Sequence, residues 1–310
     1  MAIKMLDPKK DEYVLDPASG SGGFLIGAMY HVREKYLGSV DEAMRDYAKE
    51  YIWGIDFADE ISKVSRALML IAGDGRSHMF KLNSLDSREW RGEEQNLLHA
   101  RSELQRRLLP MPTTQDNEEN KKTFQYLNFD LILTNPPFAG EIKDQGLLRQ
   151  YTFGKKKGKL VNTIERHILF IERTLDMLRP GGRMAIVLPQ GVLNNTQMEY
   201  VREYLFDKVR ILAVVGLHGN TFKPHTGTKT SVIFLQKWNE KEEPLKDYPI
   251  FMAVSKKAGK DNSGDYIYKK SPSGDYVHDG KGRKVLDHDL DEIADGFLKF
   301  AKEEKLEFVK

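Results

Sequence analysis

The feature that most constrains the fold of this chain is a regular alternation of short apolar runs with amphipathic stretches of helical length. The apolar runs are rich in β-branched and aromatic residues, which favours strands. Alternating strands and helices are typical of a mostly parallel, doubly wound sheet in an α/β fold. We therefore predict strands at residues 13–16, 51–56, 80–82, 129–134, 183–188, 210–215 and 230–237.

Two predicted helices near the start of the chain carry local signals. Ser39 and Glu42 have the spacing of a capping box at a helix N-terminus. In residues 58–73, the apolar side chains recur with helical spacing, and we expect this face to cover the sheet. The residues on this face are Ile61, Val64, Leu68 and Ile71.

Two regions depart from the alternation and set the predicted domain boundaries. Residues 86–128 are polar and highly charged, so we expect an insertion that is helical in its first half and a loop over 109–122. Beyond residue 240, turn-forming residues recur every few positions and a short helix follows. The sequence thus predicts a main domain over 1–240 with an insertion at about 86–128, and a small C-terminal appendage over 241–310.

Composition excludes several classes of function. The chain contains no cysteine, which excludes disulfides, thiolate zinc sites and cysteine nucleophiles, and fits a reducing compartment. No apolar run approaches the roughly 18 residues of a membrane-spanning helix, and the N-terminus lacks a signal peptide. The eight histidines show no metal-ligand spacing; we expect no metal site, with His167 in a structural role. We predict a soluble cytoplasmic protein.

A glycine-rich corner, "DPASGSGGF", joins the first predicted strand to a helix. Gly20, Gly22 and Gly23 allow a ligand to approach the backbone amides closely. Asp56, at the end of the next strand, follows Gly20 by 36 positions, whereas a dinucleotide-binding site would have its acidic residue about 20 positions on. A phosphate-binding Gly-Lys-Ser/Thr ending is also missing.

These spacings favour a nucleoside-type ligand without a pyrophosphate. Asp16 would lie near an amine of that ligand, and Asp56 would bind two ribose hydroxyls. The alternative is a tight strand-to-helix turn that needs glycine only for its backbone geometry.

Together with this corner, four later motifs identify a family resemblance. The sequence also contains "GID" at 54–56, "NPPF" at 135–138, "GGRMAIVLPQGVL" at 181–193 and "GNTFKPHTGTKTSVIFLQ" at 219–236. In this order they resemble the S-adenosylmethionine-dependent N6-adenine DNA methyltransferases, and most closely the modification subunit of type I restriction-modification systems. The resemblance covers roughly residues 11–300.

The resemblance implies a class I methyltransferase fold, in which a seven-stranded sheet has an antiparallel last strand and S-adenosylmethionine binds at the carboxyl ends of the first strands. The implied cofactor-binding residues are Asp16, Ala18, Gly20, Gly22, Asp56 and Asn83. The implied catalytic residues are Asn135, Pro136, Pro137 and Phe138, and Phe222 is implied as a second aromatic residue that stacks on the target base.

The resemblance also implies DNA as substrate, and a specificity subunit and a restriction subunit as partners. In related subunits a helical domain and an aromatic-Thr-Pro motif precede the glycine corner. This chain has only 15 residues before Asp16, and we therefore expect that domain to be absent.

The Asn-Pro-Pro-Phe motif suits the chemistry of an exocyclic amine. The lone pair of such an amine is delocalised into the ring, and its proton is too weakly acidic for a side chain to remove first. The Asn135 side-chain oxygen and the Pro136 carbonyl would accept the two amine hydrogens and localise the lone pair on nitrogen. Phe138 would stack on a base flipped out of the duplex. A loop-forming Pro-Pro after a strand is the alternative.

A lysine run follows the motif in "FGKKKGKL", residues 153–160. Lys155, Lys156, Lys157 and Lys159 are candidates for DNA phosphate contacts, and a solvated loop is the alternative. Two other functions remain open for the whole chain. One is methylation of a glutamine side chain or of RNA by the same corner, and the other is a catalytically idle assembly subunit.

Overall fold

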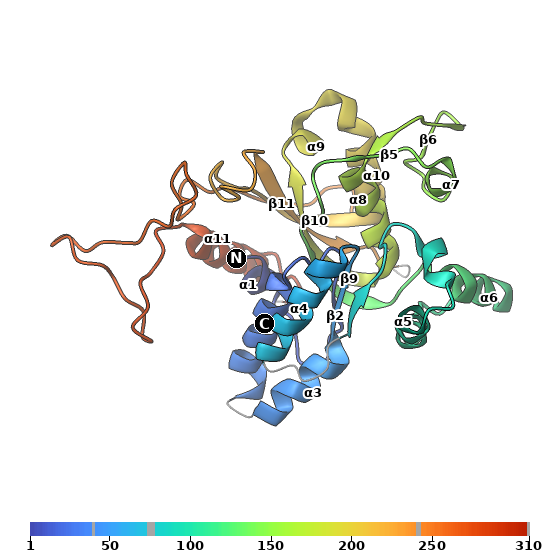
Figure 1. Ribbon diagram of the computed structural model, residues 1–310. Helices are drawn as coiled ribbons and strands as arrows, with labels where there is room; N and C mark the ends of the chain where they lie inside the picture. Colours follow the sequence, from blue (N-terminus) through green and yellow to red (C-terminus); the bar gives the residue numbers. More distant parts are fainter. Residues whose placement is uncertain (39–40, 73–77, 240–242, 309–310) are drawn as a thin grey trace.

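A central eight-stranded sheet organises the protein. The computed structural model describes residues 1–38, 41–72, 78–239 and 243–308, and Figure 1 shows their arrangement. The strands follow the order β12-β10-β11-β9-β4-β1-β2-β3, and β11 is antiparallel to both of its neighbours while the other pairs are parallel. Their bounds are β1 (Val14–Asp16), β2 (Ile52–Asp56), β3 (His78–Lys81), β4 (Phe129–Thr134), β9 (Leu178–Pro189), β10 (Val209–Gly216), β11 (Thr230–Lys237) and β12 (Phe251–Val254).

Helices cover both faces of the sheet, and this explains the unbroken apolar runs inside the central strands, such as Leu131 to Leu133 in β4 and Met184 to Leu188 in β9. Along β4, Leu131 and Leu133 join the core on one face while Ile132 joins the core on the other. The first face packs against α1 (Ala2–Leu6), α2 (Gly23–Val32), α3 (Asp41–Tyr51), α4 (Asp59–Ile71) and α11 (Leu290–Glu303). The second packs against α5 (Gln95–Gln105), α7 (Gln145–Leu148), α8 (Arg166–Met177), α9 (Gly191–Asn194) and α10 (Glu199–Lys208).

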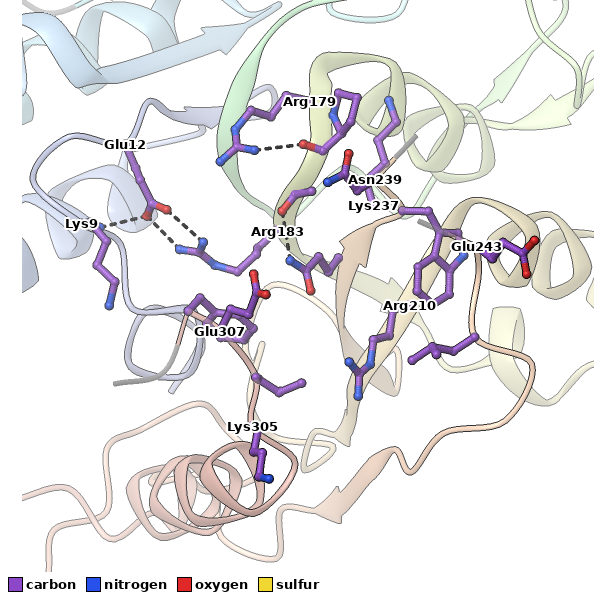
Figure 2. Close-up of a pocket in the computed structure, with 17 residues that line it drawn as sticks. Lys9, Glu12, Arg179, Arg183, Arg210, Lys237, Asn239, Glu243, Lys305 and Glu307 are labelled. Atoms are coloured by element: carbon purple, nitrogen blue, oxygen red, sulfur yellow. Dashed lines mark hydrogen bonds and ion pairs between the residues drawn. The ribbon is translucent and has the colours of Figure 1, made fainter. Parts of the chain in front are cut away.

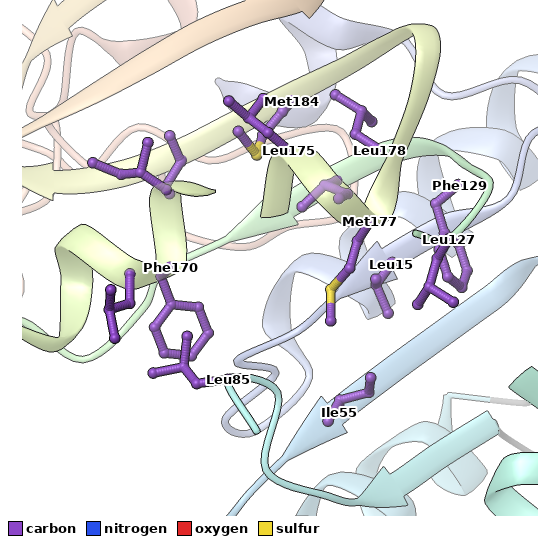
Figure 3. Close-up of a cluster of buried hydrophobic side chains, with 14 of the residues drawn as sticks. Leu15, Ile55, Leu85, Leu127, Phe129, Phe170, Leu175, Met177, Leu178 and Met184 are labelled. Carbon is purple, nitrogen blue, oxygen red and sulfur yellow. The ribbon is translucent and has the colours of Figure 1, made fainter. Parts of the chain in front are cut away.

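The core on the second face is shown in Figure 3. Leu175 and Met177 of α8 and the adjoining Leu178 lie over Leu15 and Met184 of the central strands, and all five are buried. Burying a leucine- or methionine-sized side chain stabilises the fold by about 1.5–3 kcal/mol. This packing fixes α8 beneath the carboxyl-end loops that follow β3 and β4.

The predicted mostly parallel α/β fold is confirmed, and β4 and β11 have the predicted bounds. The predicted strand number was wrong, because β12 adds an eighth strand beside β10. Its four residues form too short a run to stand out among the turn residues around it. The capping-box prediction at Ser39 lies outside the described residues.

The C-terminal segment contributes to the main sheet and its covering layer. Strand β12 pairs with β10, and Phe297 of α11 packs on Phe234 of β11. The sheet and its first face therefore continue past the predicted boundary at residue 240. Within the described part of this segment, residues 255–289 project away from the sheet (Figure 1).

Two helix predictions are corrected by the structure. Helix α4 turns Ser65 and Met69 toward the core and leaves its predicted face exposed. The exposed residues are Ile61, Val64, Leu68 and Ile71, with exposed fractions of 37–81%. The predicted loop over 109–122 contains α6 (Thr114–Thr123), which begins with Thr113 as its N-cap, accepting from the Asp116 amide.

The segments between the main strands and helices contain further short elements. These are the π-helix η1 (Arg33–Leu37), the 3-10 helices η2 (Ser87–Arg91) and η3 (Thr196–Met198), the pair β5 (Glu141–Ile142) and β8 (Ile164–Glu165), and the pair β6 (Lys155–Lys156) and β7 (Lys159–Leu160). Among the described residues, no helix is both long and apolar enough to cross a membrane.

Candidate active site

The glycine corner lies where β1 and β2 end side by side. Gly20 has a φ of +52° and Gly22 a φ of +81°, conformations that L side chains rarely adopt. The Asp56 carboxylate accepts a hydrogen bond from the Gly20 amide at 2.9 Å and another from the Ala58 amide at 3.0 Å. The acidic residue that ends β2 therefore also fixes the shape of the glycine loop after β1.

A cavity of about 460 Å³ opens beside this loop at the carboxyl edge of the sheet. This volume lies within the usual range for small-molecule sites. Six of the predicted site residues line it: Ala18, Gly20, Asp56, Asn83, Asn135 and Pro137. Further lining residues that sequence reasoning missed include Phe57, Ile61, Leu85, Leu147, Arg166 and Phe170.

The missed residues form the apolar walls of the cavity. Phe57 could have been found from its position directly after Asp56, at the end of a strand. Leu147 and Phe170 come from the segments after β4 and give no local signal, because only the tertiary fold brings them to the cavity.

Two predicted cofactor residues lie behind the cavity wall. Asp16 is 1% exposed, and its carboxylate accepts from the Ala18 amide at 3.1 Å. Burial raises the pKa of Asp16 to about 7, and the bond from Ala18 opposes this shift. Gly22 faces α4, where an added Cβ would lie 3.0 Å from the Ser65 Oγ, so the lack of a side chain here serves helix packing as well as loop geometry.

The loop after β3, residues 83–86, forms one side of the cavity and is held by donors distant in sequence. Trp90 Nε1 donates to the Asn83 carbonyl at 2.8 Å, and Tyr151 Oη donates to the Leu85 carbonyl at 2.6 Å. Between them, the buried Arg173 donates from Nε to the Ser84 carbonyl at 2.8 Å. Three consecutive carbonyls thus have fixed partners, which makes this wall rigid.

Arg173 connects the same loop to the end of the insertion. Its other two nitrogens donate to the Gln125 carbonyl at 2.5 Å and the Phe124 carbonyl at 2.9 Å, and its guanidinium lies 5.6 Å from the Trp90 ring centroid. One buried cation on α8 therefore ties the cavity wall to the 86–128 insertion.

The Asn-Pro-Pro-Phe motif follows β4 and separates two cavities. The Asn135 Oδ1 atom is buried and has no hydrogen-bond partner among the described residues. Pro136 is buried, whereas Pro137 is exposed and lines both the first cavity and a second one of about 590 Å³. A buried acceptor without a donor is uncommon in a folded protein, and the Asn135 Oδ1 atom therefore remains available for a hydrogen bond from outside the described residues.

The residues that line the second cavity include Phe138, His167, Val192, Met198 and Thr226. Phe222 lies next to it, with its ring centroid 6.0 Å from that of Phe138 in an edge-to-face arrangement. Burial lowers the pKa of His167, which favours a neutral imidazole. Both aromatic residues predicted to stack on a base therefore lie together.

The lysine run forms a β-hairpin, β6–β7, whose turn contains Lys157 and Gly158 with positive φ. Lys155, Lys156, Lys157 and Lys159 are all exposed. The base of the hairpin is fixed because the buried Glu172 carboxylate accepts from the Thr152 amide at 2.6 Å and the Phe153 amide at 3.0 Å.

A larger cavity, of about 680 Å³, lies at the opposite end of the strands (Figure 2). It contains Arg183 at the start of the buried part of β9 and Glu12 just before β1, which form an ion pair at 2.8 Å. Many of its polar groups thus bind one another, and the site lies at the edge of the sheet away from Asn135. Among the described residues, no group of three or more His, Asp or Glu side chains could hold a metal ion.

Comparisons with known proteins agree with this geometry. Residues 1–308 match the family model described as N-6 DNA Methylase. The chain is 26% identical over 243 residues to the type I restriction enzyme EcoEI methylase subunit of Escherichia coli, covering 78% of this chain and 41% of that protein. It is 27% identical over 238 residues to the StySPI methylase subunit of Salmonella potsdam, covering 76% of this chain and 38% of that protein.

A solved structure shows the same fold. The type I restriction-modification system methyltransferase subunit from Streptococcus thermophilus superposes with a TM-score of 0.55 at 20% identity, covering 97% of this chain and 51% of that one. The chain spans about two fifths of the length of the two curated relatives above.

Proposed function

This chain belongs to the N-6 DNA methylase family, and we propose that it is the catalytic part of a DNA methyltransferase that modifies adenine N6 with S-adenosylmethionine. The observation that carries the proposal is the buried, unpartnered Asn135 Oδ1 at a corner between two cavities. One cavity suits the cofactor and the other the target base. Pro137 lines both cavities, so a methyl donor bound in the first would lie close to an acceptor amine in the second.

The residues of the first cavity fit S-adenosylmethionine. Gly20 has no side chain to obstruct a ligand, and a Cβ added there would meet no atom within 4 Å. Asp56 offers carboxylate oxygens for ribose hydroxyls, and Phe57 and Ile61 offer apolar surface for an adenine ring. When bound, the cofactor supplies an electrophilic methyl group on a sulfonium.

The chain's own residues would activate the amine by orientation. Asn135 Oδ1 and the Pro136 carbonyl accept its two hydrogens and favour a tetrahedral nitrogen with its lone pair directed toward the first cavity. The two prolines restrict the backbone and keep these acceptors in place. No general base is needed before transfer, because the proton becomes acidic only once the new N–C bond forms.

The second cavity would receive an adenine flipped out of the duplex. Phe138 lines this cavity and Phe222 packs against Phe138 beside it, and stacking on these rings would offset part of the unstacking cost. The exposed lysines of the β6–β7 hairpin, Lys155, Lys156, Lys157 and Lys159, would contact DNA phosphates nearby.

We further propose that the protein acts inside the cell as part of a type I restriction-modification complex. A specificity subunit would read the DNA sequence and a restriction subunit would complete the nuclease form. The support is the similarity to methylase subunits of type I restriction enzymes.

Product analysis tests this function. The chain is mixed with tritiated S-adenosylmethionine, unmethylated DNA and a lysate of source cells that lack the native subunit. We expect label in N6-methyladenine after the DNA is digested to nucleosides. Label in protein glutamine or in RNA would instead support methylation of those substrates. Cofactor binding without any transfer would support an idle assembly subunit.

The raised pKa of Asp16 leads to a testable prediction about how the cofactor affinity depends on pH. Because its pKa is raised to about 7, the carboxyl is mostly protonated below pH 7, whereas a cationic ligand favours the ionised form. We therefore expect the affinity for S-adenosylmethionine to fall about tenfold for each pH unit below 7. Isothermal titration calorimetry between pH 5.5 and 7.5 measures this slope.

The matched control is Asp16→Asn, which keeps the size of the side chain and cannot titrate. It should bind the cofactor more weakly and with little pH dependence over the same range. An equal pH slope in the variant and the unchanged chain would assign the titration to another group.

A further inference from the structure

Residues 255–289 form an arm that leaves the body of the protein at the catalytic edge. The arm continues from β12, which is parallel to β10, and the Ser255 amide donates to the carbonyl of Gly216, the last residue of β10. Figure 1 shows the arm as an extended projection of several hairpin-like loops. It has little core of its own, since Ser255 and Gly259 are its only buried residues.

The base of the arm is bound to the loop that carries Phe222. Asn220 Nδ2 donates to the Lys260 carbonyl at 3.3 Å and to the Asn262 Oδ1 at 3.1 Å. Lys260 Nζ in turn donates to the Lys223 carbonyl at 2.9 Å. The arm and the aromatic side of the proposed base cavity are therefore anchored to the same loop, 217–229.

Three turns with a common hydrogen-bond pattern shape the arm. In each turn an amide donates to the carbonyl four residues on, from Asp261 to Asp265, from Ser271 to Asp275 and from Asp279 to Arg283. Asp261 accepts from three backbone amides, and Asp279 accepts from two amides and from Arg283. The Asp261 and Asp279 carboxylates are thus held by donors within their own turns.

Three lysines of the arm differ from these carboxylates, because they form no ion pair among the described residues. The arm contains eight Lys and Arg residues and six Asp residues. Among the described residues, Lys269, Lys270 and Lys284 form no ion pair with a carboxylate, unlike Lys257, Lys281 and Arg283. Lys284 Nζ lies 4.0 Å from the centroid of the Tyr276 ring and Lys270 Nζ lies 5.5 Å from the same centroid.

Two ammonium groups held around one exposed aromatic ring create a local positive charge that favours an anionic partner. We propose that the arm binds the phosphate backbone of duplex DNA flanking the target base, with Lys269, Lys270 and Lys284 as its phosphate contacts. This inference rests on the proposed function, which brings DNA to the adjoining edge of the sheet. The arm then lies along the DNA beside the loop of Phe222, and contacts it without reading its sequence.

The test uses the full chain and a fluorescein-labelled 30-base-pair duplex, with binding measured by fluorescence anisotropy over a range of salt concentrations. A Lys269→Gln/Lys270→Gln/Lys284→Gln variant should bind about tenfold or more weakly at low salt, and the slope of log K against log salt should fall by about one per lysine that contacts phosphate. The charge-matched control, Lys49→Gln/Lys122→Gln/Lys302→Gln, should keep the slope of the unchanged chain. A triple Lys→Arg variant of the arm should also keep it.

An arm variant that retains both affinity and salt slope would overturn the proposal, as would an unchanged chain that does not bind DNA. Retained DNA binding with loss of a partner subunit would assign the arm to a protein contact instead. Because binding is measured without methyl transfer, the arm and the proposed function can fail separately. If the chain methylates DNA but the arm variant binds DNA like the unchanged chain, the proposed function stands and the proposed role of the arm in DNA binding is wrong.

Discussion

An Asn135→Ala variant is expected to transfer methyl groups to DNA about 100- to 1000-fold more slowly than the unchanged chain, because one of two preorganised acceptors is lost. The Asn135 Oδ1 atom has no internal partner, so its removal leaves no donor of the described residues unpaired and should cost little stability. Cofactor affinity should change by only a few-fold, since the ribose-binding acid and the glycine loop remain. Single-turnover rates with tritiated cofactor, in a preparation that methylates DNA, measure the effect.

Two further variants sharpen this test. Asn96→Ala removes the same atoms from an exposed position on α5 and should leave the rate unchanged. Asn135→Asp keeps an acceptor but lacks the amide dipole and adds charge, so we expect a rate between those of the alanine variant and the unchanged chain. An Asn135→Ala variant with full activity would refute the assigned role and support an assembly subunit whose methylation is performed elsewhere.

The sequence predicted the sheet well because its central strands are buried on both faces. Strands β4 and β11 each contain an unbroken apolar run, Leu131 to Leu133 in β4 and Val232 to Leu235 in β11, so both strands could be located directly from the sequence. The glycine corner and Asn135 were also readable, since each follows a strand and breaks its pattern with residues of restricted or unusual backbone geometry.

Other features depend on contacts that no local pattern records. The apolar stripe of α4 predicted a buried face, but the helix turns Met69 inward and leaves Ile71 81% exposed. Periodicity identifies an apolar face without stating what covers it. The rigid wall at residues 83–86 gave no signal either, because its donors, Trp90, Tyr151 and Arg173, come from three separate segments.

Replacement of Arg173 is the second change for which we expect a large effect, in this case on the stability of the fold. Arg173→Met is expected to lower the free energy of unfolding by about 3–5 kcal/mol, because two buried carbonyls and one partly buried carbonyl lose their donor and a buried cation is removed. The variant should also bind S-adenosylmethionine more weakly, since residue 173 no longer holds the Ser84 carbonyl and with it the cavity wall. Urea unfolding monitored by circular dichroism measures the stability, and calorimetry measures the binding. Arg91→Met, at an exposed position on η2, should change stability by less than about 0.5 kcal/mol.

The effect of Arg173→Met should itself depend on pH. Burial raises the pKa of Asp176 to about 6, and the charge of Arg173 opposes that shift, so the variant should raise the pKa further. A carboxyl with a raised pKa in the folded state stabilises the fold fully at low pH and loses that contribution as pH rises through its folded pKa. The destabilisation should therefore be larger at pH 8 than at pH 5. Equal losses at both values would show that Arg173 acts through its hydrogen bonds to carbonyls alone, and no loss at either would contradict its role in holding the cavity wall.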